Sequence, residues 1–277
     1  MDAVPSITLN NGVLIPQLGF GTFQIKPADA KDATLTALKL GYRHIDTAEM
    51  YGNEREVGEA VRESGLARDQ VFVTSKLNNG FHAYDDALKA FDGTLADLGF
   101  DYLDLFLIHW PLPNVGDYVE TWRAMEEMYR SGRVNAIGVS NFQPHHLRRI
   151  LDETEIVPAV NQIEVHPYLA QDGLRAFNAE HDIATEAWSP IAQGKVLDDP
   201  TITRIAQRLG RTPAQVTLRW HLQRGDIVFP KSVTASRVKE NLALFDFELS
   251  EQDQAAITAL DRHDRTGPDP DKFNYVP

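Results

Sequence analysis

The sequence predicts a (β/α)8 barrel, an α/β fold in which eight parallel strands alternate with helices around a closed core. Short apolar stretches typical of buried strands alternate with longer amphipathic stretches typical of helices along most of the chain. The length of 277 residues is close to the usual size of such a barrel. Polar residues stand where several apolar stretches end, and barrel enzymes carry their active sites at those strand ends.

Eight short, mostly apolar stretches are expected to form the barrel strands. The first contains Gly19-Phe-Gly21, but Gln24 stands where a dinucleotide-binding loop would have its third glycine, so a Rossmann fold is not favoured. The expected strands lie within 16–23 and at 42–46, 71–76, 103–109, 136–140, 159–163, 183–188 and 227–231.

The segments between and after these strands are expected to be helical because their apolar residues recur every three or four positions. A barrel of eight units needs eight helices, and the pattern yields ten, so two extra helices are expected. The expected helices lie at 28–40, 54–64, 85–98, 118–130, 143–151, 174–180, 201–209, 213–223, 236–244 and 251–260.

The two ends of the chain fall outside this repeat. Asn11-Gly12 joins two short apolar stretches and predicts an N-terminal β-hairpin, which could cover the bottom of the barrel. Residues 262–271 are rich in Asp and Pro and are expected to form a loop over the top. No linker or change of composition divides the chain, so residues 1–277 are expected to form a single domain.

The composition restricts the class of protein. The formal net charge is −13, which disfavours nucleic acid as a partner because its binding depends on basic surfaces. The chain has no cysteine, so disulfides and thiolate metal sites are excluded. We find neither a signal-peptide pattern nor an apolar stretch of the roughly 20 residues that would span a membrane. A cytoplasmic protein that binds neither nucleic acid nor membranes is therefore expected.

Four residues at or near the strand ends form a chemically coherent set: Asp46, Tyr51, Lys76 and His109. A free tyrosine has a pKa near 10 and is a weak acid at neutral pH. A nearby lysine would lower this pKa, an aspartate would keep the lysine charged, and a histidine could steer a substrate oxygen towards the tyrosine. The set suits general acid catalysis on an oxygen that gains negative charge, such as a carbonyl that receives a hydride.

A metal-dependent barrel hydrolase is one alternative. His44 and Asp46 lie two positions apart on an expected strand and so face the same side, and His109 and His166 could complete a metal site. Lys76 would then lie among the ligands, which disfavours this interpretation. We expect no metal, and we expect His44 to be an interior, hydrogen-bonded histidine.

A second polar segment, 231–237, follows the expected eighth strand. It contains Lys231, Arg237, several hydroxyl groups and the start of a helix, a combination that suits a phosphate group. A solvated basic loop is the alternative, and the position at a strand end favours the phosphate site.

One set of short stretches runs along most of the chain, at 19–22, 42–48, 51–52, 75–77, 108–111, 138–142, 161–162 and 229–232, and a second set lies at 158–164, 193–195 and 219–223. With the first set the chain resembles the aldo-keto reductases from end to end, and with the second it resembles their bacterial 2,5-diketo-D-gluconate reductase branch. The resemblance implies a (β/α)8 barrel that binds NADP(H) in an extended form, with Asp46, Tyr51, Lys76 and His109 as the catalytic tetrad. Some members of this superfamily bind the cofactor as channel subunits with slow turnover, and the complete tetrad favours an enzyme.

The resemblance also implies which residues contact the cofactor. Side chains at the fifth and sixth strand ends would bind the nicotinamide carboxamide, and Trp188 would stack on the ring. Side chains after the eighth strand would hold the 2′-phosphate and the adenine, so NADPH is expected to bind better than NADH. The implied contacts are Gly21, Thr22, Asp46, Ser140, Asn141, Gln162, Trp188, Ser189, Lys231, Ser232, Val233, Arg237, Glu240 and Asn241.

The substrate pocket is expected to include Phe23, Asn78, Trp110 and Phe273. Family members often have a tryptophan where Asn78 stands, so this pocket should be wider and more polar. Small polar carbonyls, such as α-dicarbonyls or keto sugars, are the expected substrates. We therefore expect NADPH-dependent reduction of small aldehydes and ketones to alcohols, with Tyr51 as the general acid, in a monomeric protein.

Overall fold

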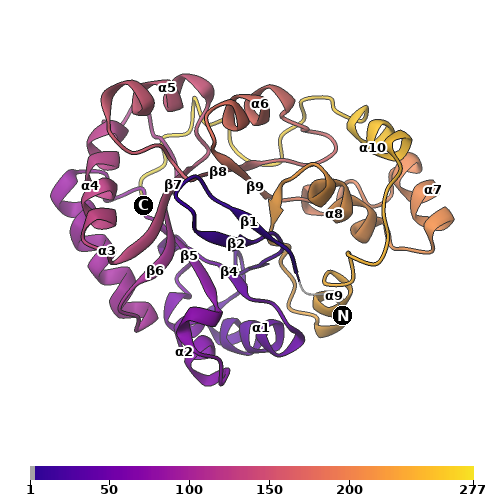
Figure 1. Cartoon of the computed structure of the whole chain (residues 1–277), viewed down its shortest axis with the longest axis horizontal. Helices are drawn as coiled ribbons and strands as arrows, with labels where there is room; N and C mark the ends of the chain where they lie inside the picture. The colour runs from indigo at the N-terminus through magenta and orange to yellow at the C-terminus, as the bar shows by residue number, and fades with distance from the viewer. Residues whose placement is uncertain (1–3) are drawn as a thin grey trace.

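A computed structural model describes residues 4–277 and contains one eight-stranded parallel sheet that closes into a barrel (Figure 1). The edge strands are joined where Val228 pairs in parallel with Leu18, and the Val228 amide donates to the carbonyl oxygen of Gln17 at 3.0 Å. The (β/α)8 barrel is therefore confirmed. The strands are β3 (Phe20–Gly21), β4 (His44–Asp46), β5 (Phe72–Leu77), β6 (Leu103–Ile108), β7 (Val134–Ser140), β8 (Val160–Glu164), β9 (Ala184–Trp188) and β10 (Ile227–Val228).

Ten α-helices lie in the described part of the chain, and most surround the barrel (Figure 1). Both α7 and α8 lie between β9 and β10, and α10 follows the last barrel unit, which accounts for the two extra helices. The helices are α1 (Pro27–Leu40), α2 (Glu54–Glu63), α3 (Tyr84–Leu98), α4 (Tyr118–Arg130), α5 (Pro144–Glu153), α6 (Asp172–Glu180), α7 (Pro200–Leu209), α8 (Pro213–Gln223), α9 (Ala235–Glu240) and α10 (Glu251–Thr258).

Two elements end three or four residues earlier than predicted. The eighth strand, expected at 227–231, ends at Val228, and Pro230 soon afterwards has no N–H to continue a ladder. The helix expected at 236–244 ends at Glu240. Beyond it Leu242 and Leu244 are both buried. Residues two positions apart do not lie on the same face of a helix, so this spacing does not continue the helical pattern.

Apolar side chains of the strands and of an N-terminal hairpin fill one end of the barrel interior. Phe72, Leu105 and Leu107 point inward and form one apolar cluster with Leu9 and Ile15 of the N-terminal hairpin. The hairpin pairs β1 (Ser6–Thr8) with β2 (Leu14–Pro16) in antiparallel register. Ile15 is fully buried, and burial of such a side chain stabilises a fold by roughly 1.5–3 kcal/mol. The hairpin therefore closes the bottom of the barrel, as predicted.

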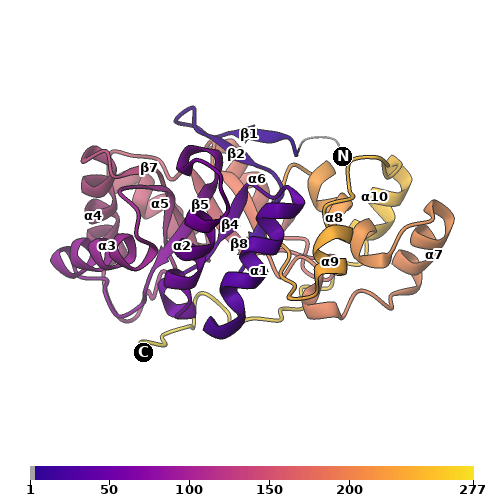
Figure 2. The ribbon, with the colours of Figure 1, turned by 90° about the horizontal axis from the view of Figure 1, so that it is seen from below.

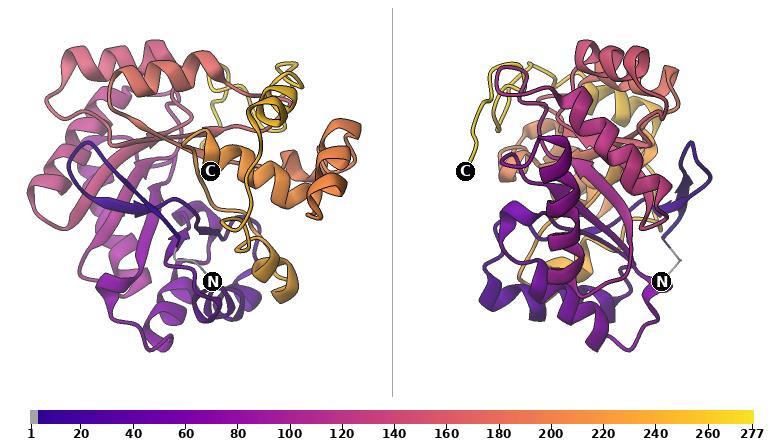
Figure 3. Two further views of the ribbon diagram at one scale, coloured as in Figure 1. Left: turned by 45° about the vertical axis from the view of Figure 1, so that its right-hand side comes forward. Right: turned by 90° about the vertical axis from the view of Figure 1, so that its left-hand side faces the viewer.

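The C-terminal segment crosses the opposite end of the barrel. Residues 261–277 contain no helix or strand. Figure 2 shows the hairpin along the upper edge and the yellow C-terminal segment along the lower edge, and the right panel of Figure 3 separates them in the same way. The strands therefore end under this segment. Within residues 4–277, we find no helix whose length and apolar character would allow it to cross a bilayer.

Candidate active site

Lys76 is the centre of a buried polar group beneath the C-terminal segment. Its Nζ donates to Asp46 Oδ1 at 2.8 Å, to the carbonyl oxygen of Thr47 at 2.8 Å and to Tyr51 Oη at 3.4 Å. These three acceptors match the three hydrogens of the ammonium group. Because Tyr51 Oη accepts from Lys76, its own hydrogen is free to point elsewhere. The strand ends and the short helix η1 (Glu49–Tyr51) thus bring together the residues that the sequence singled out.

The charges around Tyr51 differ in part from the sequence-based expectation. Burial raises the pKa of Tyr51 above its ordinary value near 10, and Lys76 acts in the opposite direction without reversing the shift. The expectation that Lys76 lowers the pKa of Tyr51 below its ordinary value is therefore wrong for the protein alone. Burial likewise acts to lower the pKa of Lys76, but Asp46, Tyr51 and Glu186 outweigh it and raise that pKa. Tyr51 therefore stays protonated and Lys76 stays charged at neutral pH.

His109 lies beside Tyr51, with 5.9 Å between the ring centroids. Burial, and to a smaller extent Lys76, holds the pKa of His109 well below its ordinary value, so the ring is neutral. Its Nδ1 is buried and has no hydrogen-bond partner within residues 4–277. Its Nε2 also lacks a partner in that range but is not fully buried, so this nitrogen can bind a substrate oxygen. His44 instead contacts the Pro16 carbonyl and the Thr74 hydroxyl, which confirms an interior, hydrogen-bonded histidine.

The ends of β7 and β9 are joined by side chains. Trp188 Nε1 donates to Asn141 Oδ1 at 2.8 Å, and Asn141 Nδ2 donates to Ser140 Oγ at 3.1 Å and to the His109 carbonyl at 3.0 Å. Asn141 therefore orients Trp188, a link that the sequence did not reveal. Ser189, directly after Trp188, has a positive φ of 49°, which turns the chain away from the strand.

Gln162 on β8 contacts two carboxylates. Its Nε2 donates to Asp46 Oδ2 at 2.8 Å and to Glu186 Oε2 at 2.7 Å. Glu186 on β9 was not identified from the sequence, although an acid two positions before Trp188 must share its inward face. This spacing of two residues was the signal in the sequence that could have identified Glu186.

The segment after β10 lies beside the first strand. A Cβ on Gly21 would come within 2.6 Å of the Phe229 carbonyl oxygen, so only glycine allows this approach. Thr22 Oγ1 donates to the Asp46 carbonyl at 3.2 Å. These contacts bring the first, second and eighth strand ends together.

The cationic residues of this segment face solvent. Lys231 and Arg237 are exposed, and neither forms an ion pair with any residue in the described range 4–277. Ser232 is buried and its Oγ accepts from the Thr234 amide at 3.1 Å, whereas Val233 is 58% exposed. Two unpaired cations next to a buried serine fit a phosphate group.

Two further predicted contacts lie at the end of α9. Glu240 and Asn241 are half-buried, and Glu240 Oε1 accepts from Thr212 Oγ1 at 2.8 Å. The hydroxyl of Thr212 also caps the first turn of α8 by accepting from the Gln215 amide. Glu240 is therefore held by the neighbouring helix rather than free in solvent.

Aromatic side chains surround the polar group. The ring centroids of Phe23 and Tyr51 are 5.1 Å apart, and those of Trp110 and Phe273 are 4.3 Å apart. Asn78 is half-buried, donates to a carboxylate oxygen of Glu49 and accepts from the Gly80 amide. The position that often carries an indole in this family is thus a polar side chain held beside a second acid.

The C-terminal segment is attached to the strand ends by Glu164, another residue that the sequence analysis missed. Glu164 is fully buried at the end of β8 and accepts from the amide and hydroxyl of Thr266, each at 2.5 Å, and from the Gly267 amide at 3.1 Å. A Cβ on Gly267 would lie 2.4 Å from Trp188 Cη2, so the segment presses against the indole. Asn79 Nδ2 adds a bond to the Tyr275 carbonyl at 2.9 Å.

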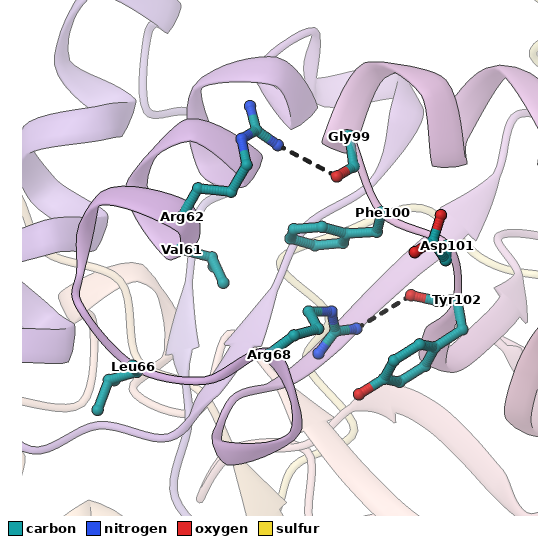
Figure 4. Close-up of a pocket in the computed structure, with 8 residues that line it drawn as sticks. All are labelled: Val61, Arg62, Leu66, Arg68, Gly99, Phe100, Asp101 and Tyr102. Carbon is teal, nitrogen blue, oxygen red and sulfur yellow. Dashed lines mark hydrogen bonds between the residues drawn. The ribbon is translucent and has the colours of Figure 1, made fainter.

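A groove of about 350 Å³ lies elsewhere, between the end of α2 and the connection from α3 to β6 (Figure 4). Its residues precede β5 and β6, so it lies at the opposite strand ends from Tyr51. Arg68 fills part of it, with its guanidinium 4.5 Å from the Phe100 ring and 4.4 Å from the Tyr102 ring, and it donates to Asp104 Oδ2 at 2.7 Å. These contacts indicate a structural role, as is usual at the bottom of such barrels.

Comparisons with known proteins agree with this arrangement. The Aldo/keto reductase family matches residues 17–262. The glyoxal reductase of Bacillus subtilis (strain 168) is 47% identical over 98% of both chains, and the methylglyoxal reductase DkgA of Escherichia coli (strain K12) is 46% identical over 96% of this chain and 97% of its own. A crystal structure of a Gox0644 mutant in complex with NADPH has a TM-score of 0.95 and 45% identity, and the match covers 99% of this chain and 100% of that one. The chain therefore belongs to the aldo/keto reductase family of oxidoreductases.

Proposed function

We propose that this protein uses NADPH to reduce small aldehydes and ketones to alcohols, with α-dicarbonyls such as glyoxal and methylglyoxal as its main substrates and keto sugars as a second class. The observation that carries the proposal is the contact of Lys76 with both Asp46 and Tyr51. The names of the two bacterial reductases support the substrate class, and the NADPH complex of Gox0644 supports the cofactor.

NADPH, when bound, supplies the hydride for the carbonyl carbon. Lys76 donates to one side of the Tyr51 hydroxyl oxygen, which leaves the hydroxyl hydrogen free to point towards the substrate. Tyr51 donates this proton to the carbonyl oxygen. His109 is neutral and donates a hydrogen bond that orients the same oxygen. Lys76 stabilises the phenolate that remains, and Asp46 holds Lys76 in place. The geometry thus supplies an acid, an orienting donor and a nearby positive charge.

The cofactor is proposed to lie from Trp188 to α9. Trp188, held by Asn141, would stack on the nicotinamide ring, and Gln162 with Ser140 would bind the carboxamide. Gly21 and Thr22 would line its path, and Ser189 and Val233 would contact it along the way. At the far end Lys231, Ser232 and Arg237 would bind the 2′-phosphate, and Glu240 and Asn241 would contact the adenine.

The substrate would lie among Phe23, Trp110 and Phe273, with Asn78 at the side. The polar Asn78–Glu49 pair favours small polar carbonyl compounds over extended apolar ones. We further propose that the single domain 1–277 acts as a monomer in the cytoplasm.

A direct test follows NADPH absorbance while purified protein is offered methylglyoxal, glyoxal, 2,5-diketogluconate and an aromatic aldehyde, with NADH in parallel. Oxidation of NADPH with the dicarbonyls, faster than oxidation of NADH, is the expected result. Turnover of only the aromatic aldehyde would refute the substrate class. Tight NADPH binding without turnover of any compound would instead favour a regulatory role.

A further inference from the structure

A second buried acid lies directly under the polar group that contains Lys76. Glu186 is fully buried and sits opposite Gln162 in the register of β8 and β9. Its carboxylate shares the barrel interior with His44 and Asp46, and His44 Nε2 is 3.9 Å from Glu186 Oε1. The proposed reaction assigns no role to this acid, and a buried acid is costly to keep without one.

The side-chain amide of Gln162 bridges Glu186 and Asp46. Its Nε2 carries two hydrogens, and the carboxylates at 2.7 Å and 2.8 Å take one each. An amide group is planar, so fixing both N–H bonds also fixes the direction of Oε1. Gln162 Oε1 accepts no hydrogen bond from any side chain or amide within residues 4–277.

We propose that Glu186 is a positioning residue: together with Asp46 it holds the Gln162 amide so that Oε1 faces the nicotinamide carboxamide and accepts from its NH2 group. This inference rests on the proposed function of the site. If the amide rotated by half a turn, two NH2 groups would face one another and the contact would be lost. Glu186 thereby contributes to the placement of the ring that delivers the hydride, without touching it.

The charges around Glu186 are compatible with this role. Burial, with a contribution from Asp46, raises the pKa of Glu186 to about 8, so the group is protonated at neutral pH. The charged or titratable neighbours are Asp46 and His44 from β4 and Lys76 from β5, and burial keeps His44 neutral with a pKa of about 4. A protonated Glu186 still accepts from Gln162 through Oε2, with its hydrogen on Oε1, which has no partner among the described residues. One negative and one positive charge then remain beside Tyr51.

The test compares Glu186→Leu, which removes the acceptor, with Glu186→Gln, which keeps an acceptor oxygen and the neutral charge. At pH 7 we expect Glu186→Leu to weaken NADPH binding by about five- to tenfold, the effect of one lost hydrogen bond, and to lower kcat more than it changes KM for methylglyoxal. Glu186→Gln should restore most of both losses. Circular dichroism verifies that each variant is folded.

A second comparison shows whether Glu186 acts through Gln162. In a Gln162→Met background, Glu186→Leu should add little further loss of NADPH binding. Full additivity would overturn the inference, as would unchanged NADPH binding in Glu186→Leu or equal losses in the Leu and Gln variants. If Glu186→Leu does not fold, Glu186→Met, which also removes the acceptor but keeps an unbranched side chain, replaces it, and NADPH binding equal to the wild type in that variant would contradict the proposal. Failure of the wild type to oxidise NADPH with any dicarbonyl would refute the proposed function instead, because NADPH binding is measured separately.

Discussion

Replacement of Lys76 by methionine tests the charge balance of the site. Lys76 is fully buried, and its ammonium group lies 2.8 Å from Asp46 Oδ1. The variant leaves Asp46 buried with Gln162 as its remaining side-chain donor. Loss of one partner of a buried ion pair costs about 3–5 kcal/mol. For a chain of this size the unfolding temperature should fall by roughly 6 to 20 °C.

The matched control is the double variant Lys76→Met/Asp46→Asn, which removes both charges. If the cost arises from the stranded carboxylate, the double variant should recover at least half of the lost unfolding free energy. Both variants should be inactive, because each lacks the cation next to Tyr51. Stability is measured by urea unfolding and activity by NADPH oxidation. A double variant as unstable as the single one would refute the charge argument, since packing alone would then explain the loss.

Three further outcomes are expected. Arg237→Ala should weaken NADPH binding by roughly 10- to 100-fold, because a charge-assisted bond to the phosphate is lost, and should change NADH binding little. The control Lys239→Ala, at an exposed residue on the same helix, should change the binding of neither cofactor. Equal losses for both cofactors would exclude the 2′-phosphate role. Glu164→Leu should release the C-terminal segment, measured as faster tryptic cleavage at Lys272, and unchanged cleavage would show that other contacts suffice. Burial lowers the pKa of His44 to about 4, so the unfolding free energy should decrease by up to about 3 kcal/mol as the pH falls from about 6.5 to 4. His44→Gln should show a shallower decrease. An identical slope would contradict the role of His44 in this pH dependence.

Much of the fold follows from local sequence signals. The hairpin at Asn11-Gly12 and the closed barrel were predicted because turn chemistry and apolar periodicity are local properties. The end of β10 was placed three residues too far, although Pro230 was a local signal that the strand ends early. The close approach of Phe229 to Gly21, in contrast, involves a distant segment. Such an approach between distant segments leaves no local trace.

The site residues that could be predicted are those whose side-chain chemistry suits catalysis and that stand at or near the end of an expected strand. Asp46, Lys76 and Tyr51 were singled out for this reason, and the structure brings them within hydrogen-bond distance. Glu186 was missed because it lies within β9, whereas Glu164 was missed although it ends β8; both act through tertiary contacts that the sequence does not show. The direction of the pKa shift of Tyr51 was also misjudged, because burial outweighs the charge of Lys76 and the depth of burial cannot be read from spacing.

The most direct test of the central claim is the rate of NADPH oxidation by methylglyoxal in Tyr51→Phe. The phenylalanine ring keeps the packing against Phe23 and His109 and removes only the hydroxyl that accepts from Lys76. Tyr84→Phe, at a partly exposed tyrosine, serves as the control. We predict that kcat falls by roughly 10²- to 10⁴-fold while the Kd for NADPH stays within about twofold of wild type. Turnover close to that of the wild type would contradict the assignment of Tyr51 as the acid.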